Sequence, residues 1–489
     1  MNLKSKVKTS LLWTFGDQIV SQVALLLFGI LLARMLSPSI FGVVGMVTIF
    51  SNFAILFIDM GFGVALIQKI DATEEHFSSV FWLNLLIGIL LYVFFYSIAP
   101  LISQFYNIPD LIIFVRVICL TFIITSLTSV QSNLLVRDLH FKKKVIFNWI
   151  AILLGYIVAF ILAYRNYGAW SLVWMTLITA STNSILYWIT SKWYPKFVFS
   201  FSKIKELSKL GLNVLGDTSI NYWSRNYDNF IIGRVLGSSD LGLYTRAYSL
   251  MLLPLRNLTS VFSKVMFPAF SKKQNDLPTI KYHYLNIIKH IALVSFPLMI
   301  GLSLVSKEFV LLVFGIKWVK MIPILAILSA LGPLQSIGSL NGLIYNSLGK
   351  ANIAFRVSLV VNFILIIALT IGVNFGIIGI TWSYFTACVL IFIPMYNTAI
   401  RQINTTLLEV FLTIKGILIA TLLMALVILV ATMYLNTNLL LSFCFKIIIG
   451  SIIYLFSVYY FEKKLFWDLI YKLKKGVAKI AQLRNNNTP

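Results

Sequence analysis

The sequence predicts an all-α membrane protein with many transmembrane helices. Of its 489 residues, 59% are hydrophobic and only 11% are charged, whereas soluble proteins carry about 25% charged residues. The mean hydropathy is +0.90, and apolar segments long enough to cross a bilayer recur along the whole chain. A soluble protein of this length would need far more polar surface than this composition contains.

About fourteen apolar segments have the length of a transmembrane helix, with short polar breaks between them. They lie near residues 11–33, 40–67, 80–104, 111–135, 145–163, 168–190, 209–233, 241–269, 287–314, 321–347, 353–373, 377–400, 411–434 and 439–461. Their boundaries are predicted only to within several residues. The breaks on the side opposite the N-terminus are too short to hold an external catalytic domain.

Two stretches of the chain share a pattern at one constant offset, which indicates an internal repeat. The first copy consists of Gly16, Asp17, Arg34, Leu36, Ser39 and Gly42, and the second of Gly216, Asp217, Arg234, Leu236, Ser239 and Gly242. Since the copies begin at the first and seventh segments, both should have the same topology, with a pseudo-twofold axis along the membrane normal. We therefore predict a six-helix lobe at 1–190, a cytoplasmic interfacial linker at 191–208, a second six-helix lobe at 209–400, an extra helix pair at 401–461 and a basic cytoplasmic tail at 462–489.

The formal net charge of +24 is explained by topology rather than by nucleic-acid binding. Most of the 40 Lys and Arg residues fall in segments that share one side of the membrane with the N-terminus. The turns on the opposite side hold only Arg34, Arg165, Arg234, Lys317 and Lys320. The positive-inside rule therefore places both termini in the cytoplasm, and we expect no nucleic-acid partner.

The sequence offers no recognisable catalytic or metal-binding constellation. The three cysteines lie in apolar runs far apart in the chain, and the four histidines lie in or beside predicted cytoplasmic loops. There are no paired Cys ligands and no Gly-rich phosphate loop. We predict that the protein is not an enzyme and needs no metal or cofactor.

Polar side chains inside the predicted helices are the candidates for function. A charged group costs several kcal/mol near the bilayer centre, so it should face water, protein or substrate rather than lipid. One face of the seventh segment carries such groups at helical spacing, with Arg225 beside it. These residues are Asp217, Asn221, Ser224 and Asp228.

The eighth segment carries three cations on one face, Arg246, Arg256 and Lys264, around Pro254. Together they would form a positive pocket that suits an anion such as phosphate. The alternative is that Asp217 and Asp228 only neutralise Arg225 and Arg256 in structural ion pairs.

Four further segments carry polar groups. Asp17 lies in the first, Asp59 in the second and Gln335 in the tenth. The fourth segment along the chain, 111–135, carries a stripe of hydroxyl side chains, Thr121, Thr125, Ser126, Thr128, Ser129 and Ser132. Hydroxyl groups in membrane helices serve either to line a cavity or to let helices pack closely, and both readings of this stripe stay open.

Three stretches resemble a known family: LLARMLSPSIFGV at 31–43, NYDNFIIGRVLGSSDLGLYTRAYSL at 226–250 and KVMFPAFSKK at 264–273. The chain is similar to the polysaccharide transporters, the Wzx-type lipid-linked oligosaccharide flippases of the MOP exporter superfamily. The resemblance covers the whole chain. It implies two six-helix bundles around a central cavity that faces each side of the membrane in turn.

The resemblance also implies a substrate and roles for the candidate residues. The substrate would be an undecaprenyl-pyrophosphate-linked oligosaccharide, a precursor of lipopolysaccharide or exopolysaccharide. It would cross from the cytoplasmic to the periplasmic or outer leaflet of a bacterial plasma (inner) membrane without ATP. The cations Arg225, Arg246, Arg256 and Lys264 would bind the pyrophosphate, and Asn221, Ser224 and Gln335 the glycan. Apart from the resemblance, the intramembrane acids Asp17, Asp59, Asp217 and Asp228 are our candidates for ion coupling or for charge pairing with the arginines.

Expected partners are membrane lipids and the polymerase and glycosyltransferases of the same pathway. Two alternatives to the flippase are open. A multidrug exporter of the same superfamily would need an acidic cavity with few cations. A membrane glycan polymerase or ligase would need a substantial outer loop, and the predicted turns are too short for one.

Overall fold

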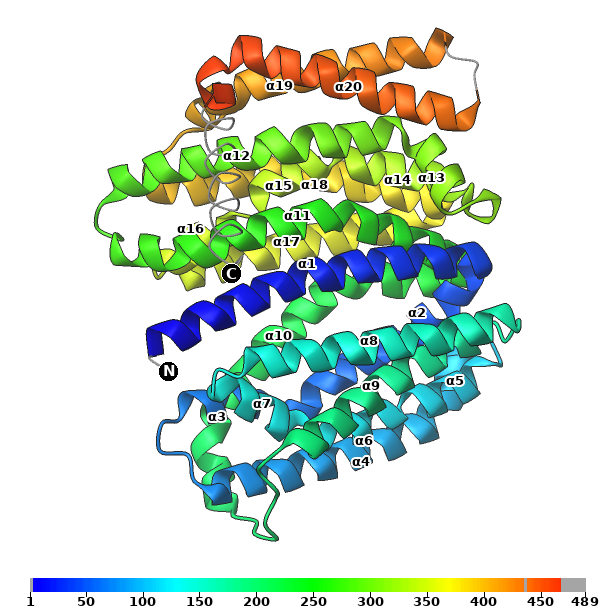
Figure 1. Ribbon diagram of the computed structural model, residues 1–489, viewed down its shortest axis with the longest axis vertical. Helices are drawn as coiled ribbons and strands as arrows, with labels where there is room; N and C mark the ends of the chain where they lie inside the picture. The colour runs from blue at the N-terminus through cyan, green and yellow to red at the C-terminus, as the bar shows by residue number, and fades with distance from the viewer. Residues whose placement is uncertain (1–2, 435–437, 468–489) are drawn as a thin grey trace, which may run out of the picture. The chain divides into compact units, whose positions relative to one another are not determined.

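The computed structural model describes residues 3–434 and 438–467, except for some side chains in the first and eleventh helices. The described residues are almost entirely helical and contain no strand (Figure 1). The chain forms two compact units, Met1–Arg246 with Leu369–Ile380, and Ala247–Ala368 with Thr381–Pro489. Each unit is considered by itself below.

The first unit contains ten complete α-helices, the beginning of an eleventh, and residues 369–380, where the end of one later helix meets the start of the next. The long helix α10 packs on α2, α3 and α4, and α8 packs on α1 and α9. The elements are α1 (Leu3–Met35), α2 (Pro38–Asp59), α3 (Phe62–Gln68), α4 (Glu74–Tyr106), α5 (Leu111–Ile118), α6 (Leu120–Ser126), α7 (Ser129–Arg137), α8 (Phe141–Tyr164), α9 (Trp170–Thr190), α10 (Phe201–Val235), the start of α11 (Ser238–Lys272) and η2 (Val373–Phe375).

The second unit contains the rest of α11 and nine further α-helices. Its core forms where α12 packs on α19 and α15, and α19 packs on α20. The elements are α12 (Leu277–Leu304), α13 (Ser306–Val313), η1 (Ile316–Trp318), α14 (Met321–Ala330), α15 (Gly332–Gly338), α16 (Asn341–Ser347), α17 (Ala351–Gly372), α18 (Gly376–Ile400), η3 (Arg401–Ile403), α19 (Leu407–Tyr434) and α20 (Leu439–Phe461).

The chain is a multi-pass membrane protein, but the predicted number of fourteen spans is not confirmed. Among the described residues, nine helical stretches are long and apolar enough to cross a membrane. Two bent pairs, Leu111–Ser126 with Ser129–Arg137 and Met321–Ala330 with Gly332–Ser347, raise the number to at most 11. The long helices α10 and α11 are not among them. In addition, α17 and α18 count as one apolar stretch.

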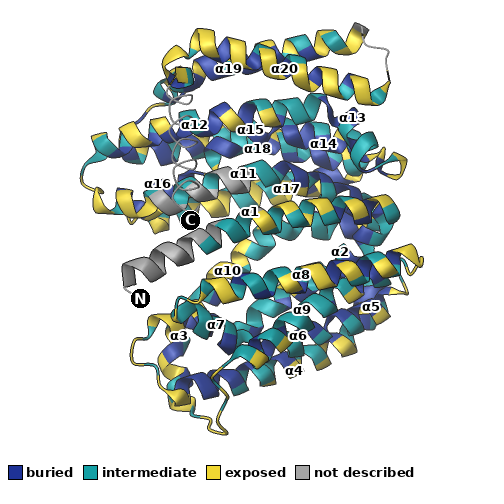
Figure 2. Cartoon of the chain, viewed as in Figure 1, coloured by how far each residue is buried: buried dark blue, intermediate teal, exposed yellow. Residues whose placement is uncertain are grey.

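Large apolar side chains are exposed along the spanning helices (Figure 2). In α19 and α20, for example, Leu422, Met433 and Phe456 are 67%, 82% and 67% exposed. Such extensive apolar exposure would destabilise a soluble protein. In a bilayer these side chains contact lipid.

The helix boundaries repeat at the offset that the sequence pattern predicts. Helices α1 and α10 end at Met35 and Val235, each with an Arg in its last turn, where a cation interacts favourably with the helix dipole. Helices α2 and α11 begin three residues later in both copies. The repeat therefore corresponds to two copies of one helix–turn–helix unit.

The two repeat copies contact each other at a pair of equivalent glycines, Gly42 in α2 and Gly242 in α11. A Cβ atom on Gly42 would collide with the backbone carbonyl of Ser238, and one on Gly242 with that of Pro38. The hydroxyl groups of Ser39 and Ser238 lie 3.3 Å apart at the same crossing. These glycines are required because two helix backbones approach each other too closely for a side chain.

Replacing Gly42 with Ala should lower the free energy of unfolding by about 1–3 kcal/mol, because the colliding atoms belong to a backbone that cannot move aside. The matched control is Gly45→Ala, one turn further along α2, where a Cβ would make ordinary contact with Leu241 at 3.5 Å. Melting temperatures of the purified variants in detergent measure the difference. Equal stability of the two variants would contradict the close crossing.

The predicted lobes do not coincide with the two compact units. The predicted second lobe begins at residue 209, yet α10 belongs to the first unit because it packs on α2, α3 and α4. Within the predicted linker, residues 191–200 are not helical and residues 201–208 form the first turns of α10. Most of the predicted tail, 462–489, lies outside the described residues.

Candidate functional site

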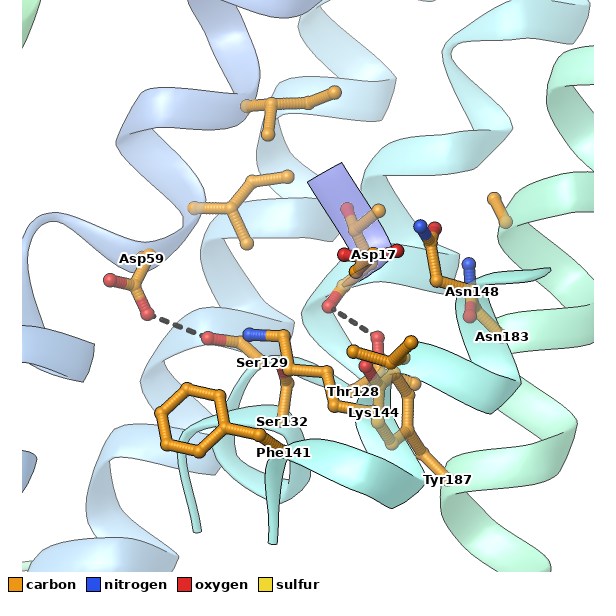
Figure 3. A pocket seen from close by; sticks show the side chains of 15 residues that line it. Asp17, Asp59, Thr128, Ser129, Ser132, Phe141, Lys144, Asn148, Asn183 and Tyr187 are labelled. Carbon is orange, nitrogen blue, oxygen red and sulfur yellow. Dashed lines mark hydrogen bonds between the residues drawn. The ribbon is translucent and has the colours of Figure 1, made fainter. Parts of the chain in front are cut away.

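The first unit contains a cavity of about 640 Å³ (Figure 3). Cavities of this size are typical of small-molecule and ion-binding sites. Charged, hydroxyl, amide and aromatic side chains from six helices line it together. The polar and aromatic lining consists of Asp17, Asp59, Thr125, Thr128, Ser129, Ser132, Phe141, Lys144, Asn148, Asn183 and Tyr187.

Asp17 enters the cavity from α1. Its Oδ1 atom accepts hydrogen bonds from the indole Nε1 of Trp149 at 2.9 Å and from the hydroxyl of Ser21 at 2.8 Å. The indole bond fixes the carboxylate against α8, and the Ser21 bond comes from the next turn of its own helix. Neither of these two donors carries a charge.

Asp59 is the last residue of α2 and lies where three helices meet. The chain turns at Met60 and Gly61, both with positive φ (44° and 72°), into α3. The Asp59 carboxylate accepts hydrogen bonds from the Gly63 N–H at 3.1 Å, the Ser129 hydroxyl at 2.6 Å and the Asn133 amide at 3.4 Å. It thereby links the starts of α3 and α7, where the helix dipole stabilises a negative charge.

The hydroxyl stripe of the fourth predicted segment lines this cavity. The segment is bent by 44° before α7, and hydroxyls bond to preceding carbonyls near the bend, for example Thr128 to the Thr125 carbonyl at 3.1 Å. Such bonds are typical of bent membrane helices. Four members of the stripe line the cavity, whereas Thr121 and Ser126 are buried in helix packing.

Two side chains of the cavity have unused hydrogen-bonding or ionic capacity within the described part of the chain. Lys144 interacts electrostatically with Asp17 but lies within ion-pair distance of no described carboxylate. The amide oxygen of Asn183 is buried without a hydrogen-bond partner among the described residues. Buried polar atoms of this kind are normally satisfied by water or a ligand.

The charges of the cavity determine what it can bind. Two acidic side chains, Asp17 and Asp59, and one basic side chain, Lys144, line it, so its formal charge is negative by one. A monovalent cation or a proton would neutralise it, whereas a pyrophosphate would be repelled. The amide and hydroxyl oxygens that line the cavity are of the kind that coordinates hard cations. The same groups can form hydrogen bonds with sugar hydroxyls.

The predicted polar face of α10 lies elsewhere in the first unit, and none of its residues lines this cavity. Asn221 donates to the Asp217 carboxylate at 3.2 Å, and Ser224 donates to the Ile220 carbonyl at 2.8 Å. Arg225 is exposed and forms no ion pair with a described carboxylate.

Asp228 and Arg246 are held by local contacts. Asp228 is 6% exposed, and its carboxylate accepts a hydrogen bond from the Asn229 N–H at 2.7 Å. The guanidinium of Arg246 lies 4.1 Å from the centre of the Phe41 ring, a cation–π contact.

The remaining predicted site residues belong to the second unit. Gln335, in the short helix α15, donates a hydrogen bond to the Tyr384 hydroxyl at 3.0 Å. Arg256 and Lys264 lie on α11, but their side chains are outside the described part of the chain. The positive pocket of the eighth segment thus stays a prediction.

Four residues of the cavity with polar side chains were not predicted from the sequence: Lys144, Asn148, Asn183 and Tyr187. Lys144 belongs to a run of three lysines, which the positive-inside rule explains without a site. A usable signal was present in the spacing, because Lys144 with Asn148 and Asn183 with Tyr187 are polar pairs four residues apart on apolar helices.

Comparison with known proteins gives the same family from sequence and a matching fold from structure. TuaB of Bacillus subtilis (strain 168), a teichuronic acid biosynthesis protein, is 35% identical over 309 residues, 62% of this chain and 63% of TuaB. The match with TuaB thus covers somewhat less than two thirds of TuaB's length. WzxC of Escherichia coli (strain K12), a lipopolysaccharide biosynthesis protein, is 26% identical over 421 residues, 86% of this chain and 83% of WzxC.

The fold is that of a solved flippase structure. The lipid II flippase MurJ in an inward closed conformation superposes with a TM-score of 0.73 at 18% identity, covering 94% of this chain and 99% of MurJ. The sequence model of the family described as "Polysaccharide biosynthesis protein" matches residues 31–323, more than half of the chain. The predicted resemblance is confirmed, and the chain belongs to the polysaccharide biosynthesis protein family.

Proposed function

We propose that this protein is a flippase that moves an undecaprenyl-pyrophosphate-linked oligosaccharide from the cytoplasmic to the periplasmic or outer leaflet. The observation that carries the proposal is the family match over residues 31–323 in a chain that crosses the membrane many times. Two relatives take part in the biosynthesis of teichuronic acid and lipopolysaccharide, and the fold is one that a lipid II flippase uses. A lipid-linked glycan is the chemistry that these observations share.

The chain would work in a bacterial plasma (inner) membrane with both termini in the cytoplasm, as the distribution of Lys and Arg predicts. It would act by alternating access as a transporter rather than as an enzyme. Its partners would be membrane lipids and the polymerase and glycosyltransferases of the same pathway. The predicted cations Arg225, Arg246, Arg256 and Lys264 would bind the pyrophosphate, and Asn221, Ser224 and Gln335 the glycan.

The cavity of the first unit would couple transport to an ion gradient through Asp17 and Asp59. Its net negative charge suits a monovalent cation or a proton. Lys144 would then compete with that ion for the carboxylates. Binding and release of the ion would bias the equilibrium between two conformations, provided the two states hold it with different affinity. Asp217 and Asp228 would serve in ion coupling or charge pairing.

The proposal is tested with purified protein in liposomes that contain a fluorescent undecaprenyl-pyrophosphate oligosaccharide. A membrane-impermeant quencher measures the fraction of label in the outer leaflet with time. Protein-dependent transfer that depends on an imposed ion gradient is the expected result. Transfer at the rate of protein-free liposomes would contradict the proposal, and transport of cationic drugs without glycan transfer would favour the multidrug exporter.

A further inference from the structure

Residues 191–200, called the strap below, connect α9 to α10 and are fixed to the start of α4. The Lys196 and Ser200 backbone N–H groups donate to the hydroxyls of Ser78 and Ser79, at 3.1 and 2.9 Å. The indole of Trp82 donates to the Lys196 carbonyl at 2.8 Å. Because main-chain groups of the strap are bonded to one helix, its path is fixed although it has no regular secondary structure.

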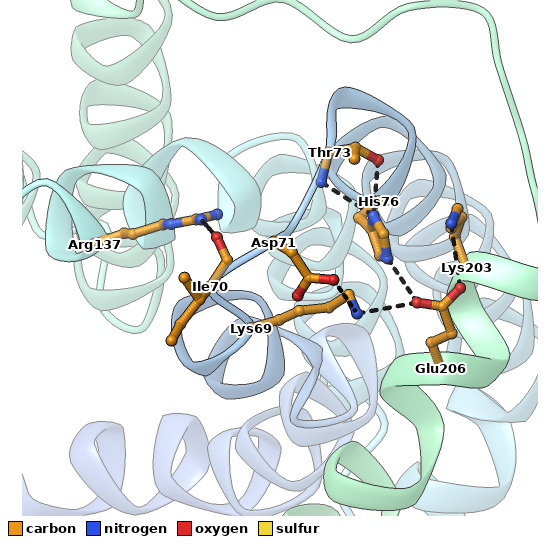
Figure 4. A network of polar contacts seen from close by, with 8 residues as sticks. All are labelled: Lys69, Ile70, Asp71, Thr73, His76, Arg137, Lys203 and Glu206. Atoms are coloured by element: carbon orange, nitrogen blue, oxygen red, sulfur yellow. Dashed lines mark hydrogen bonds and ion pairs between the residues drawn. The ribbon is translucent and has the colours of Figure 1, made fainter.

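A network centred on Glu206 fixes the first turns of α10 to the same place (Figure 4). Its carboxylate lies 3.0 Å from the Lys69 ammonium, 3.2 Å from the Lys203 ammonium and 3.2 Å from His76 Nε2. The other ring nitrogen of His76 accepts the Thr73 N–H at 3.1 Å. Hydrogen bonds from Lys69, His76 and Lys203 lower the pKa of Glu206 to about 2.

This lowered pKa predicts how the attachment of α10 depends on pH. Since the pKa of Glu206 is lower in the folded protein than its usual value of about 4.5, the stabilisation is complete above pH 4.5 and is lost as the pH falls towards 2. The protection factors of the amides at the start of α10, which correct for the intrinsic pH dependence of exchange, should therefore fall below pH 4.5. Glu206→Gln should remove that dependence, and a dependence retained in this variant would contradict the assignment. Asp71, which pairs with Lys69 at 3.3 Å, provides the control variant Asp71→Asn.

The outward side of the strap and of the first α10 turns is aromatic and basic. Tyr194, Phe197 and Phe201 are 60%, 94% and 72% exposed. Four exposed lysines accompany these rings, and none pairs with a described carboxylate, in contrast to Lys69 and Lys203. They are Lys192, Lys196, Lys205 and Lys209.

The position of this surface along the chain is a membrane boundary. Helix α9 ends at Thr190 and α4 begins at Glu74, and both are apolar enough to span the bilayer. The strap bonded to these helix ends therefore lies where hydrocarbon gives way to headgroups. Exposed aromatic rings are enriched at this depth, and clustered lysines attract anionic headgroups.

We propose that the strap and the first turns of α10 form a binding surface for anionic phospholipid headgroups. The aromatic rings insert among the acyl chains, and Lys192, Lys196, Lys205 and Lys209 contact lipid phosphates. A lipid surface is favoured over a protein partner because rings and ammonium groups alternate along the segment, so both reach a single interface. The rigid attachment to α4 keeps them aligned with it.

The test is hydrogen exchange of residues 191–209 in the full chain, in nanodiscs of phosphatidylcholine with or without phosphatidylglycerol. This readout needs no transport activity, so its failure is distinguishable from failure of the flippase proposal. In the wild-type protein, protection of this segment should rise with the phosphatidylglycerol fraction and fall again in high salt. Equal protection in both lipid compositions would overturn the proposal.

Two variants assign the effect to the lysines. Replacing all four lysines with Gln should weaken the apparent affinity of the segment for phosphatidylglycerol, measured from its protection, by roughly fivefold for each charge removed. The four-Arg variant keeps the charge and should retain the response. The control K142Q/K143Q/K272Q/K273Q removes as many charges outside this surface. An unchanged response in the four-Gln variant, or its loss in the control variant, would overturn the proposal.

Discussion

Lys446→Met is expected to lower the free energy of unfolding by about 3–5 kcal/mol, because it leaves a buried carboxylate without a counter-charge. Lys446 in α20 forms an ion pair with Glu308 in α13, and the two residues are only 4% and 6% exposed. The hydroxyl of Ser442 lies 3.3 Å from the same carboxylate oxygen of Glu308. The other oxygen has no hydrogen-bond partner among the described residues. Thermal and denaturant unfolding in detergent measures the loss.

The double variant Lys446→Met with Glu308→Leu is the matched control. Replacing both members of a buried ion pair with apolar residues is often neutral or stabilising, so most of the stability should return. This comparison separates the cost of an unpaired charge from any loss of packing between α13 and α20. A stability of Lys446→Met close to that of the wild type would show that Glu308 is not buried as described.

Asp17→Asn and Asp59→Asn should each slow glycan translocation by about tenfold to a hundredfold, the range seen when a group that supports a bound ion is replaced. Asn has nearly the same shape and can still accept a hydrogen bond, but it cannot carry the negative charge that would attract the ion. Transfer in the liposome assay measures the effect. The sensitivity of the remaining transfer to the ion gradient should fall with it.

The control for this pair is Asp110→Asn, which makes the same chemical change in an exposed turn before α5. Translocation by this variant should match that of the wild type. Unchanged melting temperatures of Asp17→Asn and Asp59→Asn would show that the loss does not come from unfolding. Wild-type rates and gradient dependence in both variants would contradict the coupling role of the cavity.

The apolar segments and the internal repeat could be predicted from the sequence. Each segment, and each copy of the repeat, is defined by residues that lie close together in the chain. The offset between Gly42 and Gly242 is also the offset between the starts of α2 and α11, and the two glycines lie where these helices cross closely. The number of spans was less predictable. Charges along α10 and α11 and the turn between α17 and α18 make length and hydropathy ambiguous there.

The cavity was predictable only in part, because it is formed by helices far apart in the sequence. Asp17 and Asp59 were notable as acids in apolar segments, and the hydroxyl stripe was notable for its spacing. Nothing local indicated that Ser129 would donate to Asp59, or Trp149 to Asp17. Lys144 belongs to a run of three lysines that the positive-inside rule already explains, so the sequence did not mark it as a site residue. Contacts of this kind depend on how the helices pack, which residue spacing alone does not determine.

The central claim is that this protein moves a lipid-linked oligosaccharide across the membrane. Its most direct test is to delete the gene in the producing cell and determine on which leaflet the lipid-linked oligosaccharide accumulates, by its accessibility to a membrane-impermeant reagent. Accumulation on the cytoplasmic leaflet is expected, with export restored by the wild-type gene. Normal transfer to the outer leaflet in a strain that lacks every other flippase would contradict it.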